Sequence, residues 1–390
     1  MKHEVLEESQ CTTVCCKILS FTQYVICLLL LSSCSLNKTS KDNVLNANLQ
    51  EEPVSVKELF SKISVIPLET NDSALLIRPH KILIKDNEYY VFDERVPATF
   101  IFNEQGKFLR KIGRKGQGPG EYREIYDAVI SRYSNTLYML SPFGKVFCYD
   151  LTGKFLKEID LPAKSNYQSM EEYDEDLLIL YTLPSYLEEP AISIVSKTTM
   201  KEVKSYWHQN RILCGLNSRM FYLYQNKVYF STPFNRKVYQ VGLDSLKNIY
   251  SWDFDKSNID LKKYLTLDIS KNIEENKLMD KYLLDSTIPY FMAQQYQNKT
   301  FYYSRLTYGF KTPKSLFYRK SDNKTFFFEK TSEGIPLNAL YFDDDCLMCI
   351  VYKEDYPAFK NVLPKEDYQK LEQRSDDDNP CLIKFYFKQN

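Results

Sequence analysis

Histidine, the side chain most often used as a metal ligand or general base, is sparse in this chain. The three histidines are His3, His80 and His208. They lie far apart in the sequence, and we identify no third ligand that would complete a metal site with His80 and His208. We therefore expect each to be satisfied within the fold or exposed to solvent. The sequence predicts no metal site and no cofactor.

Cysteine is the other residue type with obvious reactivity, and five of the ten cysteines lie in the first 34 residues. The one close pair in the remainder is Cys346-Leu-Met-Cys349. A C-x-x-C motif is either a redox motif or half of a zinc site. Here it lies in a strand-like run, where residues three apart point to opposite faces. No second pair completes four ligands, so we expect two unconnected thiols.

Four glycines, Gly113, Gly116, Gly118 and Gly120, lie within one short stretch of a chain that has only 11. The spacing of the first three superficially resembles a phosphate-binding loop. Such loops follow a strand and open a helix. Here the next residues, 125–130, have the pattern of a strand, and no Gly-Lys-Ser/Thr is present. The glycine run therefore predicts a structural connection rather than a nucleotide site.

The remaining chemistry-bearing patterns are acidic runs, and they identify no catalytic residue. Residues 343–345 and 376–378 are three consecutive aspartates each, whereas calcium loops alternate their ligands. We expect solvated turns at both. Neither a G-x-S-x-G nor an H-E-x-x-H motif is present. A pair of glycosidase carboxylates cannot be selected among 51 acidic residues, because the distance between two carboxyl groups decides their role.

Composition narrows the class of protein. Lys plus Arg and Asp plus Glu each number 51, so the formal net charge is zero. A nucleic-acid-binding protein would normally carry a basic excess or stripe, and we therefore expect no nucleic-acid partner. The chain has 31 Tyr and 24 Phe. Aromatic side chains pack well on pleated surfaces, so this excess favours strands.

An apolar run, Tyr24–Leu31, lies near the N-terminus. It is too short to span a bilayer, which takes about 20 residues, but it suits the apolar region of a secretory signal. It ends in Leu31-Ser-Ser-Cys34, which resembles the lipobox of bacterial lipoproteins. That resemblance implies cleavage before Cys34 and lipid on its sulfur, with two or more acyl chains giving a stable membrane anchor. The acidic residues before the run depart from the basic start of such signals.

These features divide the chain into three parts. We expect a signal peptide over residues 1–33 and a flexible polar tether over 34–55, which is too poor in apolar residues to order itself. A folded body follows over 56–390. The lipid anchor predicts a location in the cell envelope, at the outer membrane rather than the inner one.

The folded body contains an internal repeat. Gly106-Lys-Phe-Leu recurs as Gly153-Lys-Phe-Leu, and Tyr90 and Tyr138 begin corresponding strands at nearly the same offset. Each unit has the pattern strand, turn, strand, glycine turn, strand, and the glycines suit hairpins closed in a left-handed conformation. Four weaker copies follow. Six units of four strands, spaced about 40 to 50 residues apart, indicate a six-bladed β-propeller.

Two further segments fit this all-β architecture. Residues 62–68 form a strand pattern with no unit of their own, and the last unit ends on 382–387. We expect the first to pair with the last, because closure removes the exposed edge of an open array. Apolar residues recur at helical spacing within the otherwise polar interval 258–297, which predicts a partly helical insertion near residues 255–298. It serves either as part of a binding face or as a packing lid.

The glycine run followed by a strand, a Tyr-containing strand and Gly153-Lys-Phe-Leu resembles the linker and blade of NHL-type repeats. More closely, it resembles the six-bladed propeller lipoproteins of Bacteroides-type bacteria. In that family the glycine run joins the outer strand of one blade to the inner strand of the next. The resemblance is specific over residues 89–160, and it implies fold and location more firmly than activity.

Propellers host both binding and catalysis, so the fold alone does not decide the function. One reading is a binding or scaffold module for a glycan, a peptide or a partner protein. The alternative is a lyase or glycan hydrolase with its site in the central channel, and a third is a structural module of the envelope. A cluster of His80, an arginine and carboxylates around the axis would favour the enzyme, and a shallow aromatic face would favour binding.

Overall fold

The computed structural model describes residues 43–162, 167–183, 190–208, 219–233, 235–258, 289–308 and 313–388. The chain divides into Met1–Asn43 and a compact unit, Val44–Asn390. The first of these falls almost wholly outside the described residues, and with it Cys34 and the expected signal peptide. All that follows concerns the compact unit.

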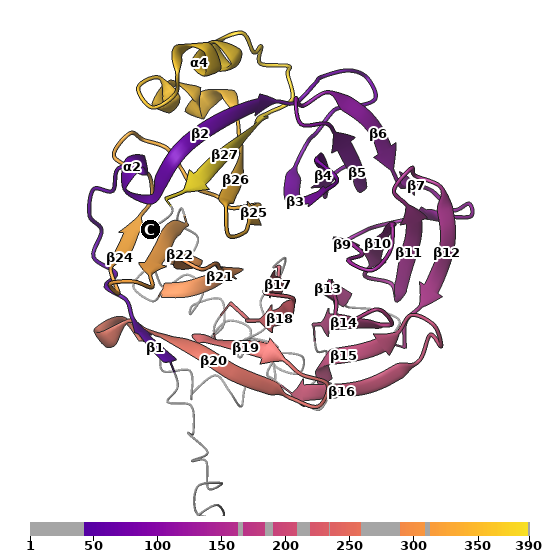
Figure 1. The fold of residues 1–390 in the computed structure, drawn as a ribbon. Coiled ribbons are helices and arrows are strands. Elements are labelled where there is room, and N and C mark those ends of the chain that lie inside the picture. The colour runs from indigo at the N-terminus through magenta and orange to yellow at the C-terminus, as the bar shows by residue number, and fades with distance from the viewer. Residues whose placement is uncertain are drawn as a thin grey trace, which may run out of the picture. The chain divides into compact units, whose positions relative to one another are not determined.

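Within the described residues, the strands form six antiparallel blades arranged in a ring (Figure 1). The fold is a six-bladed β-propeller, as the repeats predict. From the innermost strand outward, blade one is β3 (Pro79–Lys85), β4 (Glu88–Asp93), β5 (Ala98–Phe102) and β6 (Phe108–Ile112). Blade two is β9 (Asp127–Ile130), β10 (Thr136–Ser141), β11 (Lys145–Asp150) and β12 (Phe155–Asp160). Blade three is β13 (Tyr167–Glu172), β14 (Leu177–Thr182), β15 (Pro190–Ser196) and β16 (Glu202–His208).

The other three blades have the same plan. Blade four is β17 (Phe221–Tyr224), β18 (Lys227–Phe230), β19 (Lys237–Val241) and β20 (Leu246–Asp253), with β1 (Asn43–Asn46) added outside β20. Blade five is β21 (Pro289–Gln297), β22 (Phe301–Tyr308), β23 (Lys314–Arg319) and β24 (Thr325–Phe328). Blade six is β25 (Tyr341–Phe342), β26 (Cys346–Val351), β27 (Cys381–Phe387) and β2 (Phe60–Pro67).

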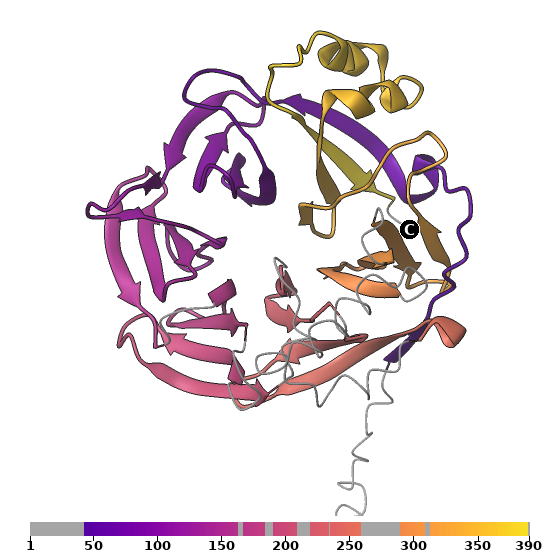
Figure 2. The ribbon, with the colours of Figure 1, turned by 180° about the vertical axis from the view of Figure 1, so that it is seen from behind.

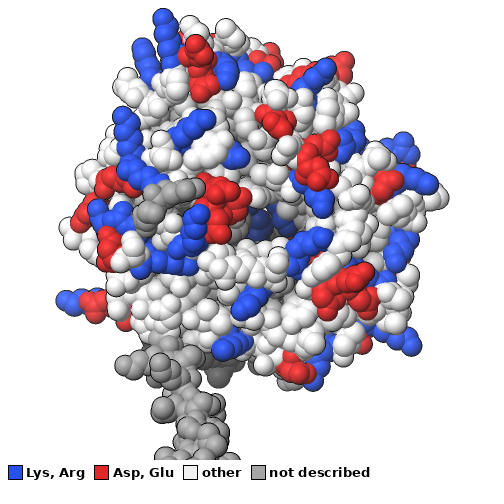
Figure 3. Space-filling view, viewed as in Figure 1, with Lys and Arg blue, Asp and Glu red and all other residues white. Residues whose placement is uncertain are grey.

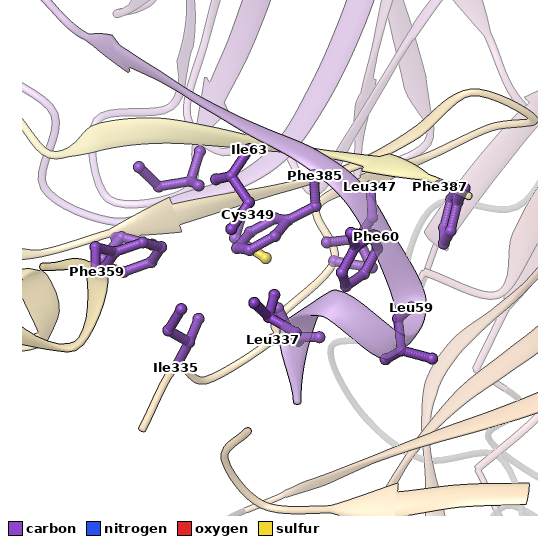
Figure 4. Packing of buried hydrophobic residues seen from close by; sticks show 14 of the residues in the cluster. Leu59, Phe60, Ile63, Ile335, Leu337, Leu347, Cys349, Phe359, Phe385 and Phe387 are labelled. Atoms are coloured by element: carbon purple, nitrogen blue, oxygen red, sulfur yellow. The ribbon is translucent and has the colours of Figure 1, made fainter. Parts of the chain in front are cut away.

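The ring closes through β2, the expected closing strand. It pairs antiparallel with β27, from Phe60 opposite Phe387 to Pro67 opposite Cys381. Figure 4 shows the buried cluster beneath this seam, which draws side chains from β2, β26, β27 and the connection before β25. The Phe60 ring lies 5.1 Å from that of Phe385 and 5.3 Å from that of Phe387. Aromatic packing therefore joins β2, the N-terminal closing strand, to β27, the C-terminal strand of the ring.

The segment before β2 follows the outside of the ring from blade four to blade six (Figures 1 and 2). The Ala47 N–H donates to the Asp253 carbonyl at 2.8 Å, and the Ser332 N–H donates to the Val54 carbonyl at 2.8 Å. Ser55 and Glu58 form a capping box at the start of α2 (Val56–Leu59). The Ser55 hydroxyl and the Val56 N–H both donate to the Glu333 carboxylate, at 2.6 and 3.0 Å. Residues 43–55, the end of the expected tether, are thus bonded to the ring.

The expected insertion near residues 255–298 ends earlier than its sequence pattern suggests. Asp255–Ser257 forms the short 3-10 helix η2, and residues 259–288 lie outside the described part of the chain. Pro289–Gln297 is not helical but forms β21, the innermost strand of blade five. This strand carries three glutamines and lacks the apolar alternation of a half-buried strand, so its sequence did not reveal it.

A helical insertion that the sequence did not predict lies between β26 and β27. It contains the 3-10 helix η4 (Lys353–Phe359) and the helix α4 (Lys365–Glu372). Arg374, just after α4, donates to the Leu68 and Asn379 carbonyls at 2.6 and 2.8 Å. The insertion therefore fixes the chain where it leaves the closing strand. Its short length and its three prolines gave no clear helical period.

The two repeated glycines close the same turn in blades one and two. In each, an Asn or Asp side chain, that of Asn103 or Asp150, accepts hydrogen bonds from two backbone N–H groups of the turn. Gly106 and Gly153 then take left-handed conformations, with φ of 80° and 100°. The sequence prediction of left-handed glycine turns is confirmed. Their surroundings differ, because Gly106 lies against the end of β2.

We expect Gly106→Ala to destabilise the ring more than the matched variant Gly153→Ala. Both replace a left-handed glycine, at a cost of about 1–2 kcal/mol. A Cβ at Gly153 makes only ordinary contacts, with Ile112 at 3.6 Å and the Lys111 carbonyl oxygen at 3.8 Å, whereas one at Gly106 overlaps the carbonyl oxygen of Pro67 in the closing strand. The free energy of unfolding in urea measures both losses. Equal losses would show that the seam tolerates displacement of β2.

Candidate functional site

Ionisable side chains from five blades gather near the axis of the ring. We call this set the axial cluster: His80, Lys81, Asp127, Glu171, Arg219 and Arg305. Four of them lie on the innermost strands β3, β9 and β13, Arg219 precedes β17, and Arg305 lies on β22. The sequence singled out His80 alone. The other five belong to no local sequence motif, because they lie on or beside strands of different blades.

Asp127 joins three neighbouring blades. Its carboxylate accepts from the Lys81 ammonium at 2.6 Å, the Ser169 hydroxyl at 3.0 Å and the Met170 N–H at 2.9 Å. The side chains of Lys81 and Asp127 are only 13% and 5% exposed. A buried ion pair is favourable only when its remaining lone pairs are satisfied, and here they are. The pair therefore fixes blades one, two and three around the axis.

Glu172 makes a similar junction between blades two and three. Its carboxylate accepts from Lys197 at 2.5 Å, from the Ser131 hydroxyl at 2.8 Å and from the Arg132 N–H at 2.7 Å. The guanidinium of Arg132 also donates to the Tyr173 carbonyl at 3.1 Å. The buried carboxylates Asp127 and Glu172 thus each have a cationic partner, which identifies them as structural groups.

Glu171, next to Glu172, has no hydrogen-bonded cationic partner among the described residues. Its carboxylate accepts from the neighbouring Glu172 N–H at 2.9 Å. Burial and, to a smaller extent, the charge of Asp127 raise the pKa of Glu171 to about 7, while the charges of Lys81 and Arg132 act in the opposite direction. This carboxyl group therefore changes its charge near neutral pH, which is a property found often at functional sites.

His80 lies on β3, with its ring 4.8 Å from that of Phe92. Burial and, to a smaller extent, the charges of Arg219 and Lys81 lower the pKa of His80 to about 4, against the opposing effect of Asp127. The imidazole is therefore neutral at pH 7. Its Nδ1 atom is buried and has no hydrogen-bond partner among the described residues. A neutral imidazole with one ring nitrogen committed to the backbone of Tyr126 has an acceptor to offer at the other.

Arg219 and Arg305 are held by neutral groups. Arg219 Nη1 donates to the Tyr296 hydroxyl at 3.2 Å and to the Leu340 carbonyl at 3.1 Å. Arg305 Nη1 donates to Asn338 Oδ1 at 2.6 Å. Within the described ranges, neither guanidinium forms an ion pair with a carboxylate. Burial lowers the pKa of Arg305, and the positive charge of Arg219 adds to that effect.

The space-filling view places charge at the axis. The face of the ring shown in Figure 3 is hollowed at its centre, and Lys or Arg atoms lie inside the hollow, with acidic side chains at its edge. Cationic groups are thus present where a ligand could enter. Arg219 and Arg305 are oriented by protein partners, so their remaining N–H donors are preorganised.

The glycine run lies between β6 of blade one and β9 of blade two, where β7 (Arg114–Lys115) and β8 (Glu121–Tyr122) form a short parallel pair. The Glu121 carboxylate accepts from the N–H groups of Gln117 and Gly118, at 3.0 and 2.9 Å. A Cβ at Gly113 would overlap the Tyr122 hydroxyl. The backbone donors that point inward are thus bound by the loop's own carboxylate.

The other residues considered from the sequence do not join the axial cluster. Cys346 and Cys349 are free, and they lie in two different core clusters on opposite sides of β26, as a strand requires. Burial raises the pKa of both thiols to about 12. His208 is the last residue of β16. The Asp343 carboxylate accepts hydrogen bonds from two N–H groups of its own turn. His3 lies outside the described residues. Among the described residues, no group of three His, Cys, Asp or Glu could hold a metal ion.

The sequence matches the family model described as "Domain of unknown function (DUF4934)" over residues 42–386. The chain therefore belongs to this family, whose matched region spans the whole propeller. No curated protein matches the sequence.

Solved structures resemble the fold. A protein of Bacteroides fragilis NCTC 9343, named as an exported protein, superposes with a TM-score of 0.74 at 18% identity, covering 89% of this chain and 100% of its own. A member of the DUF4221 family from Bacteroides vulgatus superposes with a TM-score of 0.55 at 11% identity, covering 87% of this chain and 99% of its own. At these identities the likeness shows the fold. In the described part of the chain, no helix has the length and apolar character needed to cross a bilayer.

The opposite pKa shifts of His80 and Glu171 predict opposite effects of pH on stability. His80 has a folded pKa near 4, below its ordinary 6.5, so it stabilises the fold fully above pH 6.5 and loses this effect as pH falls towards 4. Glu171 has a folded pKa near 7, above its ordinary 4.5, so its stabilising effect is full below pH 4.5 and is lost as pH rises through 7.

We therefore expect His80→Asn to lose less unfolding free energy than the wild type when pH falls from 7 to 4.5. Glu171→Gln should lose less than the wild type when pH rises over the same interval. Urea denaturation at both pH values measures each change. Profiles parallel to that of the wild type would show that these two groups do not titrate as described.

Proposed function

We propose that this protein is an exported binding module of the cell envelope, anchored by lipid on Cys34 at the outer membrane, that holds its ligand at the axial cluster. The ligand class is a glycan, a peptide or a partner protein. The observation that carries this proposal is the convergence of ionisable side chains from five blades near the axis of the ring, where the space-filling view shows a hollow that contains Lys or Arg atoms (Figure 3).

The chemistry of the cluster supports recognition. Its two arginines have no carboxylate partner among the described residues, and neutral groups orient both. The likeness to a protein named as exported supports a location outside the cytoplasm. The acids that are fully engaged, Asp127 and Glu172, serve the ring itself.

A second function, catalysis in the channel by a lyase or glycan hydrolase, is favoured by two observations. His80 is neutral with an unpartnered Nδ1, and Glu171 has a pKa near 7, so a base and an acid are both present. Against it, no hydrogen bond joins His80 to Glu171. Release of reducing ends or unsaturated products from a polysaccharide, lost in His80→Asn, would establish this alternative.

The anchor predicts a specific chemical modification. In the full chain, Cys34→Ser should abolish incorporation of radiolabelled fatty acid and move the protein from the membrane fraction to the soluble fraction. The matched variant Cys27→Ser, which changes a cysteine inside the apolar run, should retain both label and membrane association. Label retained in Cys34→Ser would refute the anchor.

A bulky side chain placed at the axial cluster tests whether the ligand binds there. We expect Asn338→Trp, which places a large side chain beside Arg305, to abolish ligand binding by the purified full chain on glycan and peptide arrays. Lys204→Trp, on the exposed outer strand β16, should bind as the wild type does. Thermal melts confirm that both variants fold. Equal binding by the two folded variants would place the ligand elsewhere on the ring.

A further inference from the structure

We infer that the axial cluster is a site for the carboxylate of an acidic sugar, with Arg219 and Arg305 binding the carboxylate and His80 accepting from a neighbouring hydroxyl. This inference deepens the proposed function and depends on it. It replaces a ligand of three possible classes by one of defined chemistry: a uronic acid, free or within a glycan.

The first argument is the distribution of charge. Two largely buried lysines of blades one and three, Lys81 and Lys197, each pair with a buried carboxylate at 2.5–2.6 Å. Arg219 lies close enough to Arg305 to lower the pKa of Arg305, yet neither arginine has such a partner within the described residues. Removing an unpaired charge from water is costly, and bringing two like charges together adds to the cost. A bound anion would offset both.

The second argument is the number of donors that remain. A guanidinium has five N–H donors, and the bonds described use one nitrogen of each arginine. Arg305 Nε is buried and has no partner. A planar fork with free donors matches the two oxygens of a carboxylate. The side chains are thus both oriented and incompletely satisfied.

The third argument is the chain segment that brings the groups together. Asn338 holds Arg305, and two residues later the Leu340 carbonyl holds Arg219. The same Leu340 carbonyl accepts from the Ile82 N–H of β3 at 3.3 Å, two residues after His80. One short connection before β25 therefore positions both arginines relative to the imidazole, across the junction of blades six and one.

The neutral imidazole of His80 indicates that the ligand carries a hydrogen-bond donor in addition to its carboxylate. His80 is neutral at pH 7, so its unpartnered Nδ1 accepts a hydrogen bond and repels no cation. A fully ionised inorganic phosphate or sulfate offers acceptors alone. A uronic acid offers a carboxylate and, on adjacent ring carbons, hydroxyl donors. It satisfies the two arginines and the histidine together.

Calorimetric titration of the purified full chain tests this inference. The probes are oligosaccharides of galacturonate and of glucuronate, the neutral oligosaccharides of galactose and of glucose as matched controls, and inorganic phosphate. We expect a uronate oligosaccharide to bind at least about 10-fold more tightly than its neutral counterpart, because charged hydrogen bonds are lost without the carboxylate. Binding should weaken as salt is raised.

Three variants assign the roles. Arg219→Met and Arg219→Lys should each weaken uronate binding about 10-fold or more, the second because a lysine keeps the charge but loses the planar fork. Arg114→Met, which removes a guanidinium that is 79% exposed on the glycine run, should leave affinity unchanged. Thermal melts show whether each variant folds. If Arg219→Met fails to fold, the comparison with the wild type uses Arg219→Lys alone.

The outcomes separate this inference from the proposed function. Phosphate binding as tightly as uronate would overturn the assignment to a sugar. Tight binding of a neutral glycan or a peptide, lost in Asn338→Trp but unchanged in both Arg219 variants, would leave the proposed channel site standing and overturn the acidic ligand. Uronate binding that persists in Asn338→Trp would place the site away from the axis and overturn both.

Discussion

Closure of the ring between β2 and β27 is the constraint on which the rest of this structure depends. A propeller blade is a small twisted sheet that buries its two faces against its neighbours, so an open array would expose an edge and a face at each end. Here the first long strand completes the last blade, and Phe60 packs on Phe385 and Phe387. Closure also brings Leu340 of blade six against Ile82 of blade one, and these residues flank the arginines and the imidazole. The site exists because the ring is closed.

The charged side chains near the axis are of two kinds. The buried carboxylates of Asp127 and Glu172 have cationic partners, whereas the two arginines are held by neutral groups. Asp127 and Glu172 each satisfy several donors from neighbouring blades, and removal of either would leave a buried cation unpaired. Among the described residues, Arg219 and Arg305 are oriented by neutral oxygens and have no carboxylate partner. The first kind of contact holds blades together, and the second is the one on which the proposed ligand site depends.

Much of the fold could be predicted because the repeat is local. Gly106 and Gly153 mark equivalent turns within contiguous sequence, and the unpaired strand pattern at 62–68 predicted closure. The strand β21 was missed because its residues lack a clean apolar alternation, and the insertion with α4 because it lacks a helical period. The axial cluster could not be predicted. Lys81 and Asp127, or Arg219 and Arg305, lie tens of residues apart, and nothing in either neighbourhood specifies the partner.

The pairing of β2 with β27 also sets the order of events as the chain is made or moved. The partners Phe60 and Phe387 lie at opposite ends of the folded unit, so their contact has a very large sequence separation, and such contacts form slowly. A chain that leaves a ribosome or crosses a secretion pore with its N-terminus first remains a series of unclosed blades until its final strand is released. The topology thus delays assembly of the complete propeller, and with it the axial cluster, until β27 has emerged.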